Sequence, residues 1–449
     1  MKSFVWFAGL AFLWLGFGFN GDYVCSEENS FQLQNTDRIL IFAPHPDDET
    51  IGTGGVIQEA VRLGIPIKVV YLTHGDSNRL SFLTYKKRPI LSKTGLQMMG
   101  DLRRDEAVAA MKSLGLKEDQ LIFLGYPDLG TFRMFTQYWG SREPFTSGFA
   151  KVSQVPYPNT YSPRALYVGE NVLNDVKSII VGFRPTKIFT TLLADMNGDH
   201  CALSLFLQVA LWDLKKTIPL PEVHSYLVHA SGWPHPRGFH ASAFLTPPIQ
   251  LQKTLMRWAM FPLTDEQIQK KKDAVLRYKT QISYSRSYLL SFARKNELFG
   301  YYDAIHLDQG QPIKPTSVQG KRKKFYLESV TYTREGDDLL VTIRSERLAK
   351  DRMKMNLYLL SYRRDIPFSQ LPKLRIDIRE ERIETVWEKR SPISIPHLRM
   401  DLNPGEEVVI RLPLARLNHP EYILSSVTAG RINSYREKIP WQVIHVMDN

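Results

Sequence analysis

The chain has 449 residues, of which 43% are hydrophobic and 23% are charged, and its formal net charge is +12 at pH 7. These proportions are those of a globular protein, and the length predicts two domains. The charge suits an anionic partner such as an acidic glycan, but the basic residues are scattered and carry no nucleic-acid-binding signature. The only two cysteines, Cys25 and Cys201, exclude a disulfide framework.

The N-terminus carries Lys2 and then an uncharged, apolar run over residues 4–19. This run is shorter than the roughly 20 residues of a membrane-spanning helix, and the pattern is typical of an export signal. We predict that residues 1–26 are a signal peptide or a retained membrane anchor. The protein is then exported and acts in the periplasm, at the cell surface or in the medium.

An apolar run at residues 39–43 predicts a buried strand, which ends at Pro44-His45-Pro46 and is followed by Asp47, Asp48 and Glu49. In open α/β sheets ligands bind at the carboxyl ends of the strands. Carboxylates crowded there repel one another and lose solvation, and a divalent cation would relieve both costs. His45 and Asp48, three residues apart, can face one ion and leave Asp47 free to carry a proton. The alternative is a solvated acidic helix N-terminus.

A second strand-to-helix junction follows residues 187–191, where Asp199-His200 precedes an apolar helical segment at residues 201–214. If the two strands are parallel, both junctions lie on the same edge of the sheet. His45, Asp48 and His200 then form a set of two histidines and one carboxylate that leaves coordination positions open. This set suits Zn²⁺ and also Fe²⁺.

Several short motifs accompany these two junctions in a fixed order. They are Thr73–Asp76, Arg103-x-x-Glu106-Ala107, Phe123–Asp128, and Lys271-x-x-Ala274 with Tyr278 and Gln281. Together with the first motif and Asp199-His200, this set resembles the PIG-L/LmbE-like zinc-dependent N-acetylglucosaminyl de-N-acetylases. The resemblance runs from about residue 38 to residue 283.

The resemblance implies a zinc-dependent hydrolase that removes N-acetyl groups from an N-acetylhexosamine in a glycan or glycoconjugate. It implies that His45, Asp48 and His200 bind the metal, that Asp47 is the general base, and that Arg103 contacts the sugar or an attached anionic group. An i,i+3 pair with Glu106 on a helix surface is the alternative for Arg103. The rival functions are an amidase that uses the same metal site on a conjugated small molecule, and a glycan-binding protein with a degraded site.

The sequence departs from the family at one position. The family reads His-Pro-Asp-His at the second junction, whereas this chain reads Asn197-Gly198-Asp199-His200. The absent histidine is thought to stabilise the developing oxyanion in the family, so this role is left open. His229, His235 and His240 are the candidates to supply it, and their spacing does not choose among them.

The alternation of strands and helices over residues 37–306 predicts a Rossmann-like, mostly parallel sheet with helices on both faces. The expected helices cover residues 53–63, 101–114, 164–180 and 201–214, and one more starts at Thr264 with a capping box and continues to about residue 282. Residues 74–100 and 125–164 are long connections that should lie over the metal edge. Their aromatic residues either bind sugar rings or pack locally.

The composition changes at residues 307–324, which we interpret as a linker. Short β-rich runs separated by turn signals then predict a β-sandwich-like accessory domain at residues 325–449. We hypothesise that this domain and the long loops hold an extended glycan.

Some polar residues near the motifs have simpler interpretations. We expect Lys270, Lys271 and Lys272 to form a solvated helix face, and Asp199 to position His200 or its loop. Asp76 and Asp128 are expected to serve turns, as aspartates often do, and His74 is expected to be a turn histidine.

Overall fold

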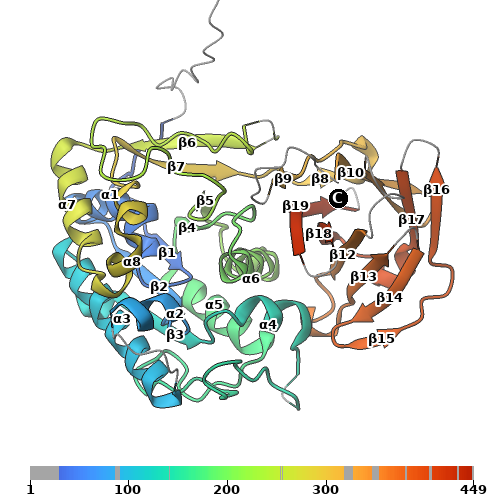
Figure 1. The fold of residues 1–449 in the computed structure, drawn as a ribbon, viewed down its shortest axis with the longest axis horizontal. Helices are drawn as coiled ribbons and strands as arrows, with labels where there is room; N and C mark the ends of the chain where they lie inside the picture. Colours follow the sequence, from blue (N-terminus) through green and yellow to red (C-terminus); the bar gives the residue numbers. More distant parts are fainter. Residues whose placement is uncertain are drawn as a thin grey trace, which may run out of the picture.

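The computed structural model describes residues 30–85, 92–140, 142–252, 254, 256–317, 327–345, 353–379, 382–403, 407–431 and 434–446. The N-terminal segment expected to be a signal or an anchor lies outside these residues. Among the described residues, no helix combines the length and the apolar character needed to cross a bilayer. An α/β domain and an all-β domain lie side by side (Figure 1).

The α/β domain is built on a seven-stranded sheet with the order β3-β2-β1-β4-β5-β7-β6. Its strands are β1 (Ile39–Ala43), β2 (Ile67–Thr73), β3 (Leu121–Tyr126), β4 (Lys187–Thr191), β5 (Glu222–Tyr226), β6 (Arg257–Pro262) and β7 (Asn296–Tyr301). The strands β1 to β5 pair in parallel, while β7 is antiparallel to β5 and β6 is antiparallel to β7. The predicted Rossmann-like, mostly parallel sheet is confirmed, with an antiparallel edge.

Helices cover both faces of this sheet (Figure 1). They are α1 (Asp48–Leu63), α2 (Arg79–Thr84), α3 (Lys93–Ser113), α4 (Thr131–Gln137), α5 (Gly169–Phe183), α6 (Gly198–Leu214), α7 (Asp265–Val275) and α8 (Lys279–Leu290). Successive side chains of β1 point to opposite faces. Ile39 and Ile41 pack in one core with residues of α1, α3 and α7, whereas Leu40 and Phe42 pack in another with residues of α5 and α6. The apolar run therefore serves two cores, which explains its lack of polar positions.

Helix α1 begins at Asp48, earlier than expected, and is interrupted at Thr53, whose φ and ψ are −141° and 17°. Beyond this interruption, the amides of Gly55 and Val56 donate to the carboxylate of Glu297 on β7. Lys271 pairs with the same carboxylate at 2.6 Å, and both side chains are buried. The expectation of a solvated face is therefore wrong for Lys271, because Glu297 compensates its charge inside the core.

The helix expected from Thr264 to about residue 282 is divided into α7 and α8. Its predicted start is confirmed, because Thr264 and Gln267 form both hydrogen bonds of a capping box. The break between the two helices places Tyr284 and Tyr288 of α8 beside the carboxyl edge of the sheet, where both line the pocket described below.

The C-terminal domain consists of two β-sheets. One is formed by β10 (Ser329–Glu335), β11 (Asp338–Arg344), β16 (Arg399–Asn403) and β17 (Glu407–Pro413). The other contains β8 (Ile305–His306), β9 (Thr316–Ser317), β12 (Met353–Tyr362), β13 (Lys373–Arg379), β14 (Arg382–Glu388), β15 (Ser391–Ile393), β18 (Tyr422–Arg431) and β19 (Ser434–His445). One hydrophobic core contains residues of both sheets, so the sandwich-like fold is confirmed.

The region expected to be a linker is partly structured. The strands β8 and β9 both pair with β19, so the chain joins the C-terminal sheet at residue 305 and again at residue 316. The expected linker is therefore wrong for residues 307–317, while residues 318–324 lie outside the described part of the chain. Strand pairing over long sequence distances, which local composition does not report, holds this segment.

Helices α4 and α6 join the two domains. The ring of Trp212 lies 4.6 Å from that of Tyr362, and Phe132 of α4 packs 6.0 Å from Trp441 of β19. Lys438 of β19 donates to the thiol of Cys201, which is buried. A single hydrophobic cluster thus contains side chains from both domains, and the β domain supports helix α6, whose first turn carries His200.

Candidate metal centre

The candidate residues gather at the switch point of the sheet. Strand β1 lies between β2 and β4, so the chain leaves β1 toward one side of the sheet and later returns to the other. Crevices outside the carboxyl ends of the strands at such a point are the usual ligand sites of open α/β folds. His45 follows β1 and His200 lies in the first turn of α6 after β4. The topology therefore brings together two residues that are 155 positions apart.

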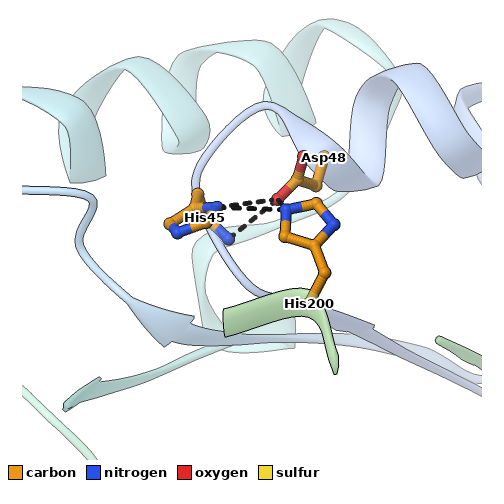
Figure 2. A group of neighbouring side chains, drawn as sticks. All are labelled: His45, Asp48 and His200. Carbon is orange, nitrogen blue, oxygen red and sulfur yellow. Dashed lines mark hydrogen bonds and ion pairs between the residues drawn. The ribbon is translucent and has the colours of Figure 1, made fainter. Parts of the chain in front are cut away.

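Three donor atoms converge there, as Figure 2 shows. His45 Nδ1 lies 3.2 Å from Asp48 Oδ2, His200 Nε2 lies 3.1 Å from the same oxygen, and the two ring nitrogens are 3.3 Å apart. A tetrahedral Zn²⁺ with ligand distances of about 2.0–2.2 Å holds its donors roughly 3.3–3.6 Å apart. The three side chains are buried and form a group able to hold a metal ion. Their spacing and donor types fit zinc.

The electrostatics of the site favour positive charge. Burial alone would lower the pKa of His200, yet Asp195 and Asp48 raise this pKa to about 9. Burial likewise opposes the ionisation of Asp48, but contacts with His200 and His45 hold its pKa well below the ordinary value. Both imidazoles are thus surrounded by carboxylates that stabilise a cation, and a metal ion satisfies the same field.

Carboxylates also contact the outer nitrogens of both histidines. His45 Nε2 lies 3.3 Å from Asp128 Oδ1 and 3.4 Å from Asp199 Oδ2, and His200 Nδ1 lies 3.2 Å from Asp195 Oδ2. Such contacts orient a histidine and fix its tautomer. Asp128 accepts the amide of Ser77, which fits the expected role in a turn. Its contact with His45 is an additional role that the sequence did not predict.

Asp199 holds a loop rather than the neighbouring imidazole. Its carboxylate accepts the amides of Leu129 and Thr131 and the hydroxyl of Thr131. The expectation that Asp199 positions its loop is confirmed, whereas Asp195 takes the place beside His200. Sequence reasoning missed Asp195 because its only local signal was its position after β4.

Asp47 lies beside the three donors in an unusual backbone conformation. Its φ and ψ are 125° and −31°, a region that non-glycine residues rarely adopt. Its amide donates to Glu49 Oε2 at 3.1 Å. Burial and the charge of Asp48 raise its pKa well above the ordinary value, opposed by Arg103. A carboxyl group with a raised pKa can both accept and return a proton near neutral pH.

Arg103 is buried and supports the loop that carries these residues. It donates to the backbone oxygens of Gly75 and Pro46 at 2.7 and 2.8 Å, and Nη2 lies 3.7 Å from Asp47 Oδ2. Gly75 has a φ of 63°, and a Cβ atom there would lie 2.1 Å from the guanidinium. The expected alternative, a surface pair with Glu106, is wrong, because Glu106 is bound to the amide and hydroxyl of Thr280.

A pocket of about 400 Å³ opens over these residues. Both long connections contribute to it at their first residues, with Ser77, Asn78 and Leu80 from one and Asp128 and Leu129 from the other. Among the described residues, aromatic side chains of the second connection do not line this pocket. Phe135 and Trp139, for example, contact Phe206 of α6 and Phe368 of the β domain.

The structure places the remaining candidate histidines in different surroundings. His229 lines the pocket, and burial lowers its pKa to about 4. His235 is exposed, and His240 Nε2 lies 3.0 Å from the backbone oxygen of Arg237. His74 is buried against Tyr157, with ring centroids 3.9 Å apart, and it belongs to none of the candidate metal groups among the described residues.

A Rossmann-like sheet with two histidines and an aspartate at its switch point defines an α/β protein with a candidate metal centre. Residues 40–211 match the model of the PIG-L family, which is described as GlcNAc-PI de-N-acetylase. The resemblance seen in the motifs is thereby confirmed.

Similar proteins were found by sequence and by structure. A 1D-myo-inositol 2-acetamido-2-deoxy-alpha-D-glucopyranoside deacetylase of Mycobacterium sp. (strain KMS) is 37% identical over 90 residues, which cover 20% of this chain and 28% of the relative. The corresponding protein of Salinispora arenicola (strain CNS-205) is 31% identical over 103 residues, covering 22% and 32%. The match spans about a third of these curated relatives or less.

Among solved structures, the N,N'-diacetylchitobiose deacetylase of Pyrococcus horikoshii has a TM-score of 0.37 and 18% identity, and the alignment covers 61% of this chain and 88% of that protein.

Proposed function

We propose that this protein is a metal-dependent hydrolase that removes N-acetyl groups from an N-acetylhexosamine-containing glycan or glycoconjugate. The observation that carries the proposal is the convergence of His45 Nδ1, Asp48 Oδ2 and His200 Nε2 within 3.1 to 3.3 Å of one another. The family match over residues 40–211 supports the reaction. The names of the similar proteins support an acetylated amino sugar as substrate.

The three donors would hold Zn²⁺, and Fe²⁺ suits the same set. When bound, the metal supplies a Lewis acid that polarises the amide carbonyl and lowers the pKa of water. The chain's own contribution begins with orientation. Asp128 and Asp199 face the outer nitrogen of His45, and Asp195 faces that of His200. These contacts keep the inner nitrogens directed at one point.

Asp47 is the proposed general base. Its carboxylate takes a proton from the attacking water and returns that proton to the leaving amine nitrogen as the C–N bond breaks. The raised pKa of Asp47 suits both steps, because a carboxyl group that holds its proton more readily than usual can both accept and return one. Arg103 holds the backbone of Pro46 and lies 3.7 Å from the Asp47 carboxylate. We therefore assign Arg103 mainly to positioning this carboxylate, although it also lines the pocket.

The proposal extends to the setting of the reaction. The pattern of residues 1–26 supports export, with the segment either cleaved or retained as an anchor, and the net charge of +12 supports an anionic glycan. Cell fractionation with N-terminal sequencing of the mature protein tests the location. Recovery of the intact chain in the cytoplasm would refute export.

The decisive experiment measures acetate release from a panel of N-acetylated glycans, with metal-stripped protein and the His45→Ala variant as controls. We expect release that requires stoichiometric metal and is lost in both controls. A protein that binds the glycans without turnover would support the rival function, a glycan-binding protein with a degraded site.

One observation favours a second candidate, an amidase acting on a conjugated small molecule. Apolar side chains of Ile51, Leu80 and Leu289 line the pocket beside the polar residues, and such walls suit a larger acyl group. Release of a longer acyl group in preference to acetate, with the same metal requirement, would support this candidate.

A further inference from the structure

Two stretches of the chain that line the pocket carry no acidic side chain. Residues 223–264 and 274–296 contain no aspartate and no glutamate, although 46 of the 449 residues of the whole chain are acidic. Both stretches contribute to the pocket wall, the first after β5 and the second through α8, whereas the rest of the wall includes Asp47, Asp48 and Asp128. The charge around the pocket is therefore divided, with carboxylates at the metal centre and none on the side formed by these two stretches.

Arg237 belongs to the first stretch and lies directly behind the pocket wall. Its guanidinium carbon is 4.4 Å from the centroid of the Tyr288 ring, and Tyr288 lines the pocket. Arg237 is exposed, and no carboxylate of the described residues pairs with it. Arg257 of the same stretch is also exposed, but it pairs with Asp303 at 2.8 Å. Arg237 thus keeps charged N–H donors that a ligand can use.

The backbone on both sides of Arg237 is held in place. Arg294, which is buried, donates to the backbone oxygens of the two residues before Arg237 at 3.2 and 2.8 Å. On the other side, the amide of Gly238 donates to the backbone oxygen of Ser287 at 2.8 Å. The loop is therefore fixed against α8, and a ligand would bind there without paying the full cost of ordering it.

We propose that Arg237 is a specificity-determining residue that binds an anionic group, a carboxylate or a phosphate, on the sugar next to the N-acetylhexosamine. This inference rests on the proposed function. Arg237 does not itself line the pocket, so the anion belongs to a part of the substrate that extends out of it. A guanidinium placed over an aromatic ring keeps N–H groups at its edge, where they can form paired hydrogen bonds to two oxygens of a carboxylate or a phosphate.

The test compares three disaccharides in which N-acetylglucosamine is linked to glucose, to glucuronic acid or to a phosphorylated glucose. Hydrogen bonds to charged groups suggest that kcat/KM of the wild type is at least about tenfold higher for an anionic disaccharide than for the neutral one. This ratio should fall towards one in Arg237→Gln, and the change should appear in KM, because the contact is remote from the scissile amide. The anionic disaccharide with the larger Arg237-dependent ratio identifies the group as carboxylate or phosphate.

Two variants and the salt concentration separate recognition from a structural role. Arg257→Gln removes the same charge from the same stretch, and it should keep the wild-type ratio. Arg237→Lys keeps the charge but not the paired donors, and it should recover part of the ratio. Raising the salt to about 0.5 M should lower the ratio of the wild type but not that of Arg237→Gln. An arginine that only supports the Tyr288 ring would affect all three substrates equally and leave the ratio unchanged.

A binding measurement distinguishes failure of this inference from failure of the proposed function. Calorimetry with the corresponding deacetylated disaccharides requires no turnover, and it should show the same Arg237-dependent preference for the anionic forms. Acetate release without any such preference, or with a preference that Arg237→Gln retains, would overturn this inference alone. A preference that depends on Arg237 in a metal-loaded protein that releases no acetate would overturn the proposed function and leave the anion site in place.

Discussion

Asp47 combines backbone strain with a proposed chemical role, and two substitutions separate these properties. Its φ of 125° is one that a non-glycine residue rarely adopts, and such strain costs about 1–3 kcal/mol. Glycine removes the strain but adds freedom to the unfolded chain, which costs about 0.5–1 kcal/mol. We therefore expect Asp47→Gly to raise the free energy of unfolding by about 0–2.5 kcal/mol.

The charge of Asp47 acts in the same direction. Burial and the neighbouring Asp48 raise its pKa well above the ordinary value, so the ionised carboxylate destabilises the fold at neutral pH. Asp47→Asn removes this charge and keeps the side-chain shape and the strained backbone. The difference in stability between the two variants therefore reports the backbone strain less the freedom that glycine adds to the unfolded chain.

Both variants lose the proposed base. General-base catalysis contributes about 10²- to 10⁴-fold, which is about 3–5 kcal/mol of the activation barrier. We expect kcat to fall by this factor in each variant, while stability stays equal or rises. The same substitution would then lower activity without lowering stability, as is expected at a strained functional site.

Denaturant unfolding measures stability with a chelator present, because bound metal would otherwise stabilise the folded state by mass action. Acetate release by metal-loaded protein measures kcat. The reasoning about strain is refuted if Asp47→Gly is less stable than the wild type by more than about 1 kcal/mol. An Asp47→Asn variant that keeps more than about a tenth of the wild-type kcat would refute the assignment of the base.

Three further predictions concern stability. Lys271→Met breaks a buried ion pair with Glu297 and should lower the free energy of unfolding, measured in urea, by about 3–5 kcal/mol. Lys270→Met, on the exposed side of the same helix, is the control and should cause no measurable change. Equal effects of the two substitutions would contradict the role of the buried pair. Burial, with Arg104 and Arg103, lowers the pKa of His74 to about 3. Below about pH 6.5 the unfolded chain therefore binds a proton at this histidine that the folded chain does not bind. The free energy of unfolding consequently falls as the pH falls. On lowering the pH from 7 to 5, His74→Phe should lose about 2 kcal/mol less than the wild type, and parallel pH profiles would exclude this cause. Trp441→Ala empties a site in the core shared by the domains and should cost about 3–5 kcal/mol; calorimetry of the wild type should show one transition for both domains, and two separate transitions would argue against a shared core.

Local sequence accounts for much of the candidate site. The apolar run of β1 is buried in full, and a turn of three residues brings His45 and Asp48 to one point. The Thr264 capping box formed as predicted, and so did the end of α1 at Gly64, which is in the left-handed conformation. These features depend on neighbours a few positions away, so their pattern is visible in the chain.

The sequence by itself therefore determined the order of the main strands and helices, the resemblance to a known family, and the three donors that meet at the sheet edge. Only the tertiary structure decided that Lys271 is buried beside Glu297 while Lys270 is exposed, that Asp195 and Asp128 stand behind the histidines, and that His229 rather than His235 or His240 enters the pocket. The physical reason is the same in each case. Burial and charge pairing arise between segments far apart in the chain, and no local spacing records which of several like residues the fold will enclose.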